Sequence, residues 1–223
     1  MKGFLGVLFI SLLAATIGKA QDGEWKLLAH MPDGRQELAT AVLNGKIFAI
    51  GGLDERQPAG QATNTVNIYN VATDTWTPGP PLPIVNQHNA AATAAGKLYA
   101  FAGQSRFTYV YDPENNSWTQ VATMPLGQAL TPAVGVINDK IYVAGGSPTG
   151  QLLQIYDPAS NTWSTGASMS VQRHHTAGGV IDGKFYVASG RGPGAQLARP
   201  QRQALPGFLA LFVRLPDEGS AFG

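Results

Sequence analysis

Polar residues recur at equivalent positions ahead of four pairs of small residues, Gly51-Gly52, Ala102-Gly103, Gly145-Gly146 and Ser189-Gly190. One column of equivalent positions holds Glu37, His88, Thr131 and His175, and a second column, two residues earlier, holds Arg35, Asn86, Ala129 and Arg173. Arginine binds carboxylates and other anions through paired N–H donors, and histidine adds pH-dependent hydrogen bonds. The sequence therefore predicts a ligand-binding site formed by Arg35, Glu37, Asn86, His88, Thr131, Arg173 and His175. The competing interpretation is that water reaches these positions and keeps them polar.

Catalytic and metal chemistry find less support in the sequence. We find no nucleophile–base pair, no phosphate-binding loop and no pair of carboxylates at a convincing spacing, so no catalytic residue is assigned. His174 and His175 are adjacent, and neighbours on a strand point to opposite faces, which argues against a metal site there. The chain has no cysteine, which removes disulfides, thiolate metal sites and thiol nucleophiles. No metal and no cofactor are predicted.

The elements that must position these residues belong to a repeated unit. Its clearest copy is the apolar stretch 140–144, which ends in Gly145-Gly146 and is followed by Tyr156 and, seven positions later, Trp163. The other two complete copies pair Tyr69 with Trp76 and Tyr111 with Trp118, again seven positions apart. A fourth copy begins at 184–188 and breaks off after Ser189-Gly190. A period of roughly 40–50 residues indicates a repeat array.

Each unit offers four strands, named a to d in chain order. In the first unit we expect strand a over about 37–43, strand b over 46–50, strand c over about 65–70 and strand d around Trp76. Asn44-Gly45 is a two-residue hairpin turn, and the segments 112–116 and 157–161 carry Asp-Pro-x-x-Asn turns. Length varies only in the loop between strands b and c. In an antiparallel sheet this loop shares a face with the start of strand a, which predicts one binding face, unless the loop is merely unconstrained.

These signals resemble the kelch motif, and the likeness covers about 24–190. The resemblance implies an all-β fold, a kelch-type β-propeller of four-stranded antiparallel blades with strand a innermost and the Tyr and Trp residues packed between blades. Two pairs, Ala102-Gly103 and Ser189-Gly190, depart from the motif by replacing the first glycine. The residues that would have structural roles are Gly51, Gly52, Tyr69, Trp76, Gly103, Tyr111, Trp118, Gly145, Gly146, Tyr156, Trp163 and Gly190.

The two ends of the chain differ from the repeats. Residues 1–20 carry Lys2, an apolar stretch, and the small residues Gly18 and Ala20 at the cleavage positions, the pattern of a secretory signal peptide that is too short for a membrane span. We therefore expect a secreted protein, extracellular or periplasmic, with no membrane span in the mature chain. Trp25 matches the last strand of a repeat and is expected to complete the final blade.

Residues 191–223 lack Tyr, Trp and the Asp-Pro turn, so we expect the repeats to occupy 21–190 and the tail to be irregular. About three and a half blades result, fewer than kelch propellers generally have, which favours a truncated copy of a longer protein with an open ring. The alternative is that 208–213 supplies a makeshift outer strand.

Composition and the resemblance together favour a binding module. Charged residues are 13% of the chain, its net charge is +1, and no basic patch alternates with aromatics, so nucleic acid is not an expected partner. The expected function is a secreted kelch module that presents its b–c loops and polar axial mouth to a protein or glycan.

Two alternatives remain open. One is a sugar mutarotase- or epimerase-like enzyme that uses Arg35, Arg173 and Glu37, and the other is a fragment with no function of its own. A copper oxidase of the galactose-oxidase kind would need a cysteine, which this chain lacks.

Overall fold

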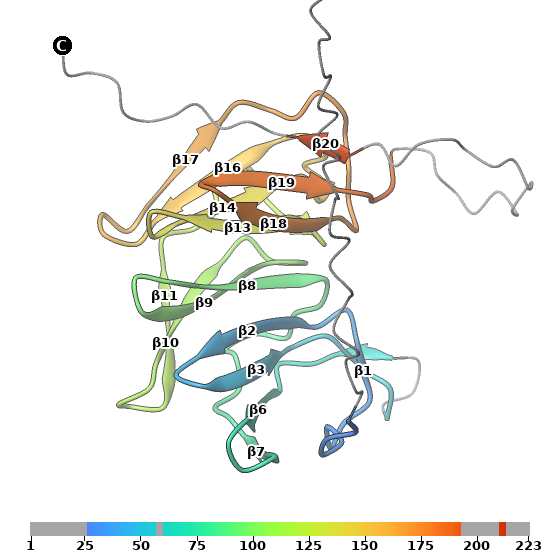
Figure 1. Ribbon diagram of the computed structural model, residues 1–223, viewed down its shortest axis with the longest axis vertical. Helices are drawn as coiled ribbons and strands as arrows, with labels where there is room; N and C mark the ends of the chain where they lie inside the picture. Colours follow the sequence, from blue (N-terminus) through green and yellow to red (C-terminus); the bar gives the residue numbers. More distant parts are fainter. Residues whose placement is uncertain (1–25, 57–59, 193–209, 213–223) are drawn as a thin grey trace, which may run out of the picture.

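The computed structural model describes residues 26–56, 60–192 and 210–212, and within them the chain is all-β. Three four-stranded antiparallel sheets and one three-stranded sheet stand side by side as blades (Figure 1). None of the described segments is a helix long and apolar enough to cross a membrane. The predicted fold class, blades of a β-propeller in an open ring, is confirmed.

The strands of each blade follow one another in the chain. Blade 1 contains β2 Ala39–Leu43, β3 Lys46–Ile50, β6 Val66–Asn70 and β7 Thr75–Pro78. Blade 2 contains β8 Asn89–Ala94, β9 Lys97–Ala102, β10 Thr108–Asp112 and β11 Ser117–Val121. Blade 3 contains β13 Ala133–Ile137, β14 Lys140–Ala144, β16 Leu153–Asp157 and β17 Thr162–Gly166, and blade 4 contains β18 Ala177–Ile181, β19 Lys184–Ala188 and β20 Ala210–Phe212.

Two smaller sheets lie beside the blades. One consists of β1 Arg35–Gln36, β4 Leu53–Asp54 and β5 Gln61–Ala62, and the other of β12 Ala129–Leu130 and β15 Ser147–Pro148. Each joins the segment before strand a to the b–c loop of the same repeat. These sheets therefore hold the b–c loops against the starts of the innermost strands.

The hairpin turns follow from their residues. Asn44 and Gly45 have φ of 49° and 70°, the left-handed conformation that a two-residue turn requires and that Asn and Gly adopt most easily. Strand b of the first repeat occupies 46–50 as predicted. Strand a begins at Ala39 instead of 37, because Glu37 has a φ of 52° and interrupts the extended chain.

The innermost strands β2, β8, β13 and β18 lie next to one another in that order around a common axis (Figure 1). They line a channel of about 380 Å³ whose walls are mainly Ala, Thr and Val side chains. Aromatic rings fill the space between blades further from the axis, as predicted. The ring centroids of Phe48 and Tyr111 are 5.2 Å apart, and those of Tyr99 and Tyr156 are 5.4 Å apart.

Each strand-d tryptophan makes a hydrogen bond to the segment that precedes its blade. The indole Nε1 of Trp76, Trp118 and Trp163 donates to the backbone carbonyls of Ala29, Pro80 and Ala122 at 2.9, 2.9 and 3.0 Å. Each acceptor lies four residues after the preceding tryptophan of the sequence. Trp118 is buried and the other two are half-buried.

The small pairs link each blade to the next through the backbone. The amides of Gly52, Gly103 and Gly146 donate to carbonyls at the start of the following repeat, those of Asn86, Ala129 and Arg173, at 2.8, 3.0 and 2.9 Å. Both members of every pair have a positive φ, including the non-glycine residues Ala102 at 62° and Ser189 at 63°. Ala102 and Ser189, which replace the first glycine of the motif, thus keep the backbone conformation of that glycine.

Blade 4 takes its third strand from the tail. β20 pairs antiparallel with β19, with Tyr186 opposite Phe212. This strand lies inside the segment 208–213, so the expectation of a wholly irregular tail after residue 190 is wrong at that point. The predicted signal peptide at 1–20, Trp25, and the remaining tail segments 193–209 and 213–223 lie outside the described residues.

Candidate functional site

The mouth of the channel is encircled by Glu37, His88, Thr131 and His175, which we call the mouth ring. All four have φ between 50° and 54°, an uncommon conformation for residues with a side chain. Their backbones form a hydrogen-bonded series, in which the amides of His88, Thr131 and His175 donate to the carbonyl of the preceding ring member at 2.9, 2.8 and 3.0 Å. One residue from each blade is therefore fixed at the same level of the axis.

Three of the four mouth-ring side chains converge. Glu37 Oε2 lies 3.7 Å from His88 Nε2, and Glu37 Oε1 lies 4.0 Å from His175 Nε2. The two imidazole rings stand nearly perpendicular, with centroids 5.5 Å apart. The Thr131 hydroxyl instead donates to the Leu130 carbonyl at 2.8 Å and accepts from the His175 amide at 3.0 Å. The sequence prediction grouped these four residues, and the structure brings Glu37, His88 and His175 together.

The two histidines have defined partners on their other ring nitrogens. His88 Nδ1 lies 2.7 Å from Gln87 Oε1, and His175 Nδ1 lies 2.5 Å from His174 Nδ1. Burial lowers the pKa of His175, and the nearby Glu37 carboxylate counters this only in part. A neutral His175 imidazole at neutral pH can accept a hydrogen bond or bind a cation through a ring nitrogen.

The second predicted column, which lies two residues before the mouth ring in each repeat, does not join the group at the mouth. Arg35 Nη1 donates to the carbonyls of Gly51 and Thr65 at 3.0 and 2.8 Å, and its side chain is fully buried. Asn86 Nδ2 donates to the Ala102 carbonyl at 2.9 Å, so both side chains hold the carbonyl of the first residue of a small pair. The predicted ligand-binding site included Arg35 and Asn86, but the structure directs both side chains to backbone carbonyls and away from the mouth ring.

The physical reason is local. Residues two apart share a face only along a continuous strand, and the positive φ of Glu37 and His88 breaks that continuity. Of the remaining members, Ala129 is buried and Arg173 is half-buried.

An ionic cluster fixes the first b–c loop around Arg35. Arg56 pairs with Asp33 at 2.5 Å and with Asp54 at 2.9 Å, and Asn67 Nδ2 donates to the second Asp33 oxygen at 3.0 Å. Hydrogen bonds from Arg56 hold the pKa of Asp54 down at about 2, while burial lowers the pKa of Arg35. The longest variable loop is thus anchored by charge as well as by backbone pairing.

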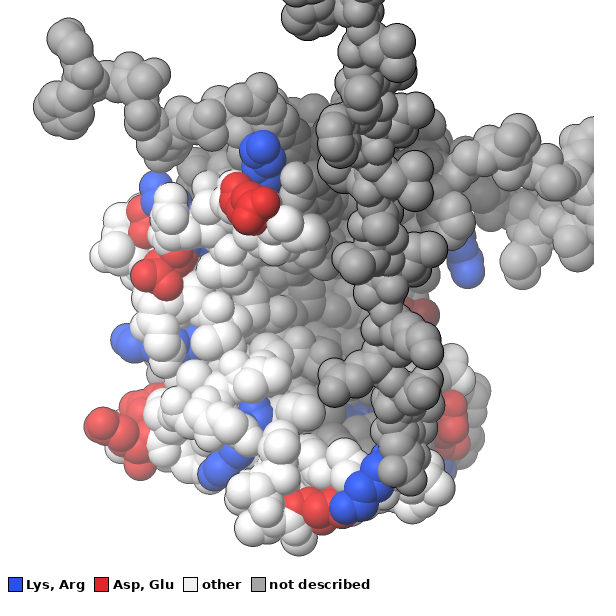
Figure 2. Space-filling view, viewed as in Figure 1, with Lys and Arg blue, Asp and Glu red and all other residues white. Residues whose placement is uncertain are grey.

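Exposed apolar side chains accompany the mouth. We call the face that carries the b–c loops and the connections between blades the loop face, and the opposite face, with the hairpin turns, the turn face. Three connections and one b–c loop of the loop face each expose a large hydrophobic residue: Val85, Leu126, Val171 and Phe107. Acidic and basic side chains are interspersed over the described surface seen in Figure 2.

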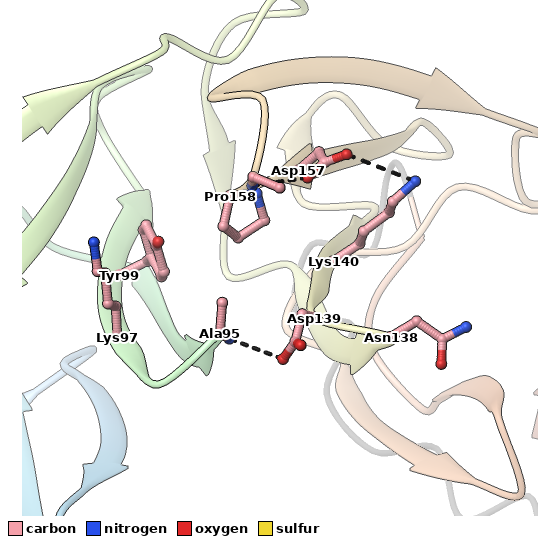
Figure 3. A pocket seen from close by; sticks show the side chains of 9 residues that line it. Ala95, Lys97, Tyr99, Asn138, Asp139, Lys140, Asp157 and Pro158 are labelled. Carbon is pink, nitrogen blue, oxygen red and sulfur yellow. Dashed lines mark hydrogen bonds and ion pairs between the residues drawn. The ribbon is translucent and has the colours of Figure 1, made fainter.

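The turn face carries a cavity of about 500 Å³ between blades 2 and 3 (Figure 3). Lys140 Nζ lies 3.7 Å from Asp157 Oδ2 at its wall, and the Ala95 amide donates to Asp139 Oδ1 across the blade boundary at 2.9 Å. Sequence reasoning missed this cavity, although the lysine that starts strand b in every repeat was a visible signal. Its two lysines, Lys97 and Lys140, come from that position.

Comparison with known proteins accounts for the repeats. The family model described as the kelch motif matches residues 34–83 and 88–125. Residues 34–83 and 88–125 are kelch repeats. The structure of YjhT shares the kelch-type fold with a TM-score of 0.68 over 77% of this chain and 64% of that chain, at 19% identity.

Several curated kelch proteins align with part of the chain. The kelch-like protein terF of Aspergillus terreus is 35% identical over 143 residues, which are 56% of this chain and 31% of that protein. The human kelch-like protein 38 is 30% identical over 174 residues, 75% of this chain and 29% of that protein. The kelch repeat and BTB domain-containing protein 1 of cowpox virus is 28% identical over 131 residues, 55% and 22% of the two chains. The chain thus spans less than a third of these relatives.

Proposed function

We propose that this kelch chain is a secreted binding module that holds a protein on its loop face. The proposal rests on four exposed hydrophobic residues, Val85, Phe107, Leu126 and Val171, on the face that also carries the b–c loops of variable length. The turn face exposes Val71 and Ile181 as well, so the test must compare the two faces. Interfaces commonly combine apolar anchor residues with a polar rim. A single exposed hydrophobic residue is normal on a protein surface, whereas several on one face indicate an interaction site.

The architecture supports the same face. Length differences between repeats fall in the b–c loops, while the blades beneath them keep one frame. Loops on a rigid support are where proteins most often place binding residues. The relatives whose names describe kelch-like and BTB-domain proteins fit an interaction role, since kelch repeats recur there beside other modules.

The binding proposal is tested by site-specific photocrosslinking. A photoreactive amino acid replaces Phe107 or Leu126 on the loop face, and Val71 or Glu114 on the turn face serves as the matched exposed control. Incubation with the extracellular fraction of the source cells should give a discrete protein adduct from the loop-face positions alone. Adducts from Val71 or Glu114 without any from Phe107 and Leu126 would place binding on the turn face and contradict the proposal. A glycan array with the same chain separates a glycan ligand from a protein.

Secretion is tested on its own. The full chain is expressed in cells with a general secretory pathway, and the N-terminus of the exported protein is sequenced. We expect an exported chain that begins at Gln21, because Gly18 and Ala20 supply small side chains at the cleavage positions. A chain retained in the cytoplasm with residues 1–20 intact would overturn this part of the proposal without affecting the binding face.

A further inference from the structure

Glu37, His88 and His175 place one carboxylate oxygen and two imidazole nitrogens within 4.8 Å of one another. They come from blades 1, 2 and 4, and the hydrogen-bonded backbone of the mouth ring fixes the level of all three. The side chains are 31%, 23% and 29% exposed, so the group faces the channel mouth and remains accessible from solution.

The separations within this group do not suit direct hydrogen bonds. The 3.7 and 4.0 Å distances from the Glu37 oxygens to His88 and His175 exceed the usual limit of about 3.2 Å for an N–H···O bond. Around a tetrahedral ion with bonds of about 2.0–2.1 Å, ligand atoms lie about 3.3 Å apart. Small rotations of these partly exposed side chains would close the present gaps to that distance.

Both imidazole rings are also oriented by a contact at Nδ1, the ring nitrogen that faces away from Glu37. Gln87 Oε1 lies 2.7 Å from His88 Nδ1, and when this nitrogen carries the proton the Nε2 lone pair is left toward Glu37. His175 is held through Nδ1 by His174, which leaves its Nε2 toward the same carboxylate. Histidines that bind metals commonly have their second ring nitrogen held in this way.

We propose that Glu37, His88 and His175 form a binding site for one divalent transition-metal ion of the Zn²⁺ class at the mouth of the channel. Two imidazoles and one carboxylate suit zinc and its neighbours, whereas Ca²⁺ and Mg²⁺ prefer sets made of oxygen ligands. Three protein ligands leave a further coordination position for water or for a group of a bound partner. The site goes beyond the proposed protein binding and does not depend on it.

This metal site could not be predicted from the sequence for two reasons. Its ligands are 51 and 87 positions apart along the chain, and only the alignment of repeats relates them. The obvious histidine motif, His174-His175, supplies one ligand and one orienting neighbour, so it does not act as a pair of ligands.

Binding is measured by calorimetric titration of the chelator-treated full chain with ZnCl₂, and by visible absorption during titration with CoCl₂. We expect one ion per chain and a rise in melting temperature with zinc. Glu37→Gln, His88→Gln and His175→Gln should each weaken zinc binding at least about tenfold, because each removes a ligand. His30→Gln is the matched control, since His30 is exposed and lies outside the group, and it should bind as the unaltered chain does.

The site is overturned if zinc binds with unchanged affinity to His88→Gln and His175→Gln, or if the His30→Gln variant loses the ion instead. Circular dichroism of each metal-free variant shows whether it has folded. If a variant fails to fold, the position of the ion in the unaltered chain is located by anomalous scattering at the zinc edge. Density between Glu37, His88 and His175 supports the site, and density only elsewhere overturns it.

Discussion

Trp118 and Pro80 are joined across the boundary between blades 1 and 2, where the indole Nε1 donates to the proline carbonyl at 2.9 Å. The equivalent boundaries carry a second bond, because Asp74 accepts from the Ala29 amide and Asn161 from the Ala122 amide. Proline has no N–H, so Pro80 cannot make that second bond. At this point of the boundary the Trp118 indole therefore bonds to Pro80 without the second bond found at the two equivalent points.

Replacing Trp118 with Phe tests that connection. The variant should lower the free energy of unfolding by about 1–3 kcal/mol, through the lost hydrogen bond and the space left by the smaller ring. Urea unfolding followed by far-UV circular dichroism measures the loss. Thr119→Ser, at the exposed neighbouring position, should stay within about 0.5 kcal/mol of the unaltered chain. Equal stability of the two variants would contradict the role assigned to the indole.

A glycine of a hairpin turn, Gly45, and a glycine of a small pair, Gly52, both have positive φ and can be compared. Gly45, at 70°, has open space where a Cβ would lie, whereas a Cβ on Gly52, at 97°, would meet the Gln36 carbonyl at 2.5 Å. Gly45→Ala should cost about 1–2 kcal/mol for the left-handed backbone alone. Gly52→Ala should cost about 1–3 kcal/mol more, because backbone atoms must move. Thermal and urea unfolding measure both, and an equal cost would show that the close approach does not matter.

Arg35 is expected to stabilise the fold, since its guanidinium holds the carbonyls of Gly51 and Thr65. Arg35→Met keeps most of the aliphatic volume and removes those bonds, so it should lower the free energy of unfolding by about 1.5–3 kcal/mol. Amide hydrogen exchange in the first b–c loop should rise as well. Arg173→Met, at the half-buried equivalent position, is the control and should change stability less. If the two variants are equally stable, Arg35 does not anchor the loop.

Tyr156 gives a pH-dependent prediction. Burial, with smaller contributions from Tyr99 and Asp157, raises its pKa to about 12 from an ordinary value near 10. The unfolded chain releases this proton first, so the stabilising contribution is complete below pH 10 and is lost as pH rises toward 12. The absorbance at 295 nm of the unaltered chain minus that of Tyr156→Phe should titrate with a midpoint near 12. A midpoint near 10 would mean that the phenol is not shielded as the structure has it.

Local signals in the sequence were sufficient for the blades. The 46–50 strand and the Asn44-Gly45 turn are set by apolar residues and by residues that tolerate positive φ, and both follow from local rules. The packing of aromatic rings between blades was implied by the kelch resemblance, and the structure has such contacts between Phe48 and Tyr111 and between Tyr99 and Tyr156. The repeat alignment also identified the three mouth-ring residues that converge.

The side-chain directions at the mouth and the turn-face cavity depend on backbone conformations that residue types do not predict. Glu37, His88, Thr131 and His175 adopt positive φ although none is glycine, and this turn separates them from the column two residues earlier. This turn directs Arg35 away from the mouth ring and toward the carbonyls of Gly51 and Thr65. The turn-face cavity depends on how two neighbouring blades meet, which a pattern within one repeat cannot show.

The bonds that the second glycines make to the following repeat use only main-chain atoms. The segment between β4 and β5 can therefore differ in length and composition without altering how neighbouring sheets are spaced. Such a frame suits the insertion of new recognition sequences, because the strands on either side hold the ends of the loop in place. The b–c loop of one repeat can then change without a change in the others.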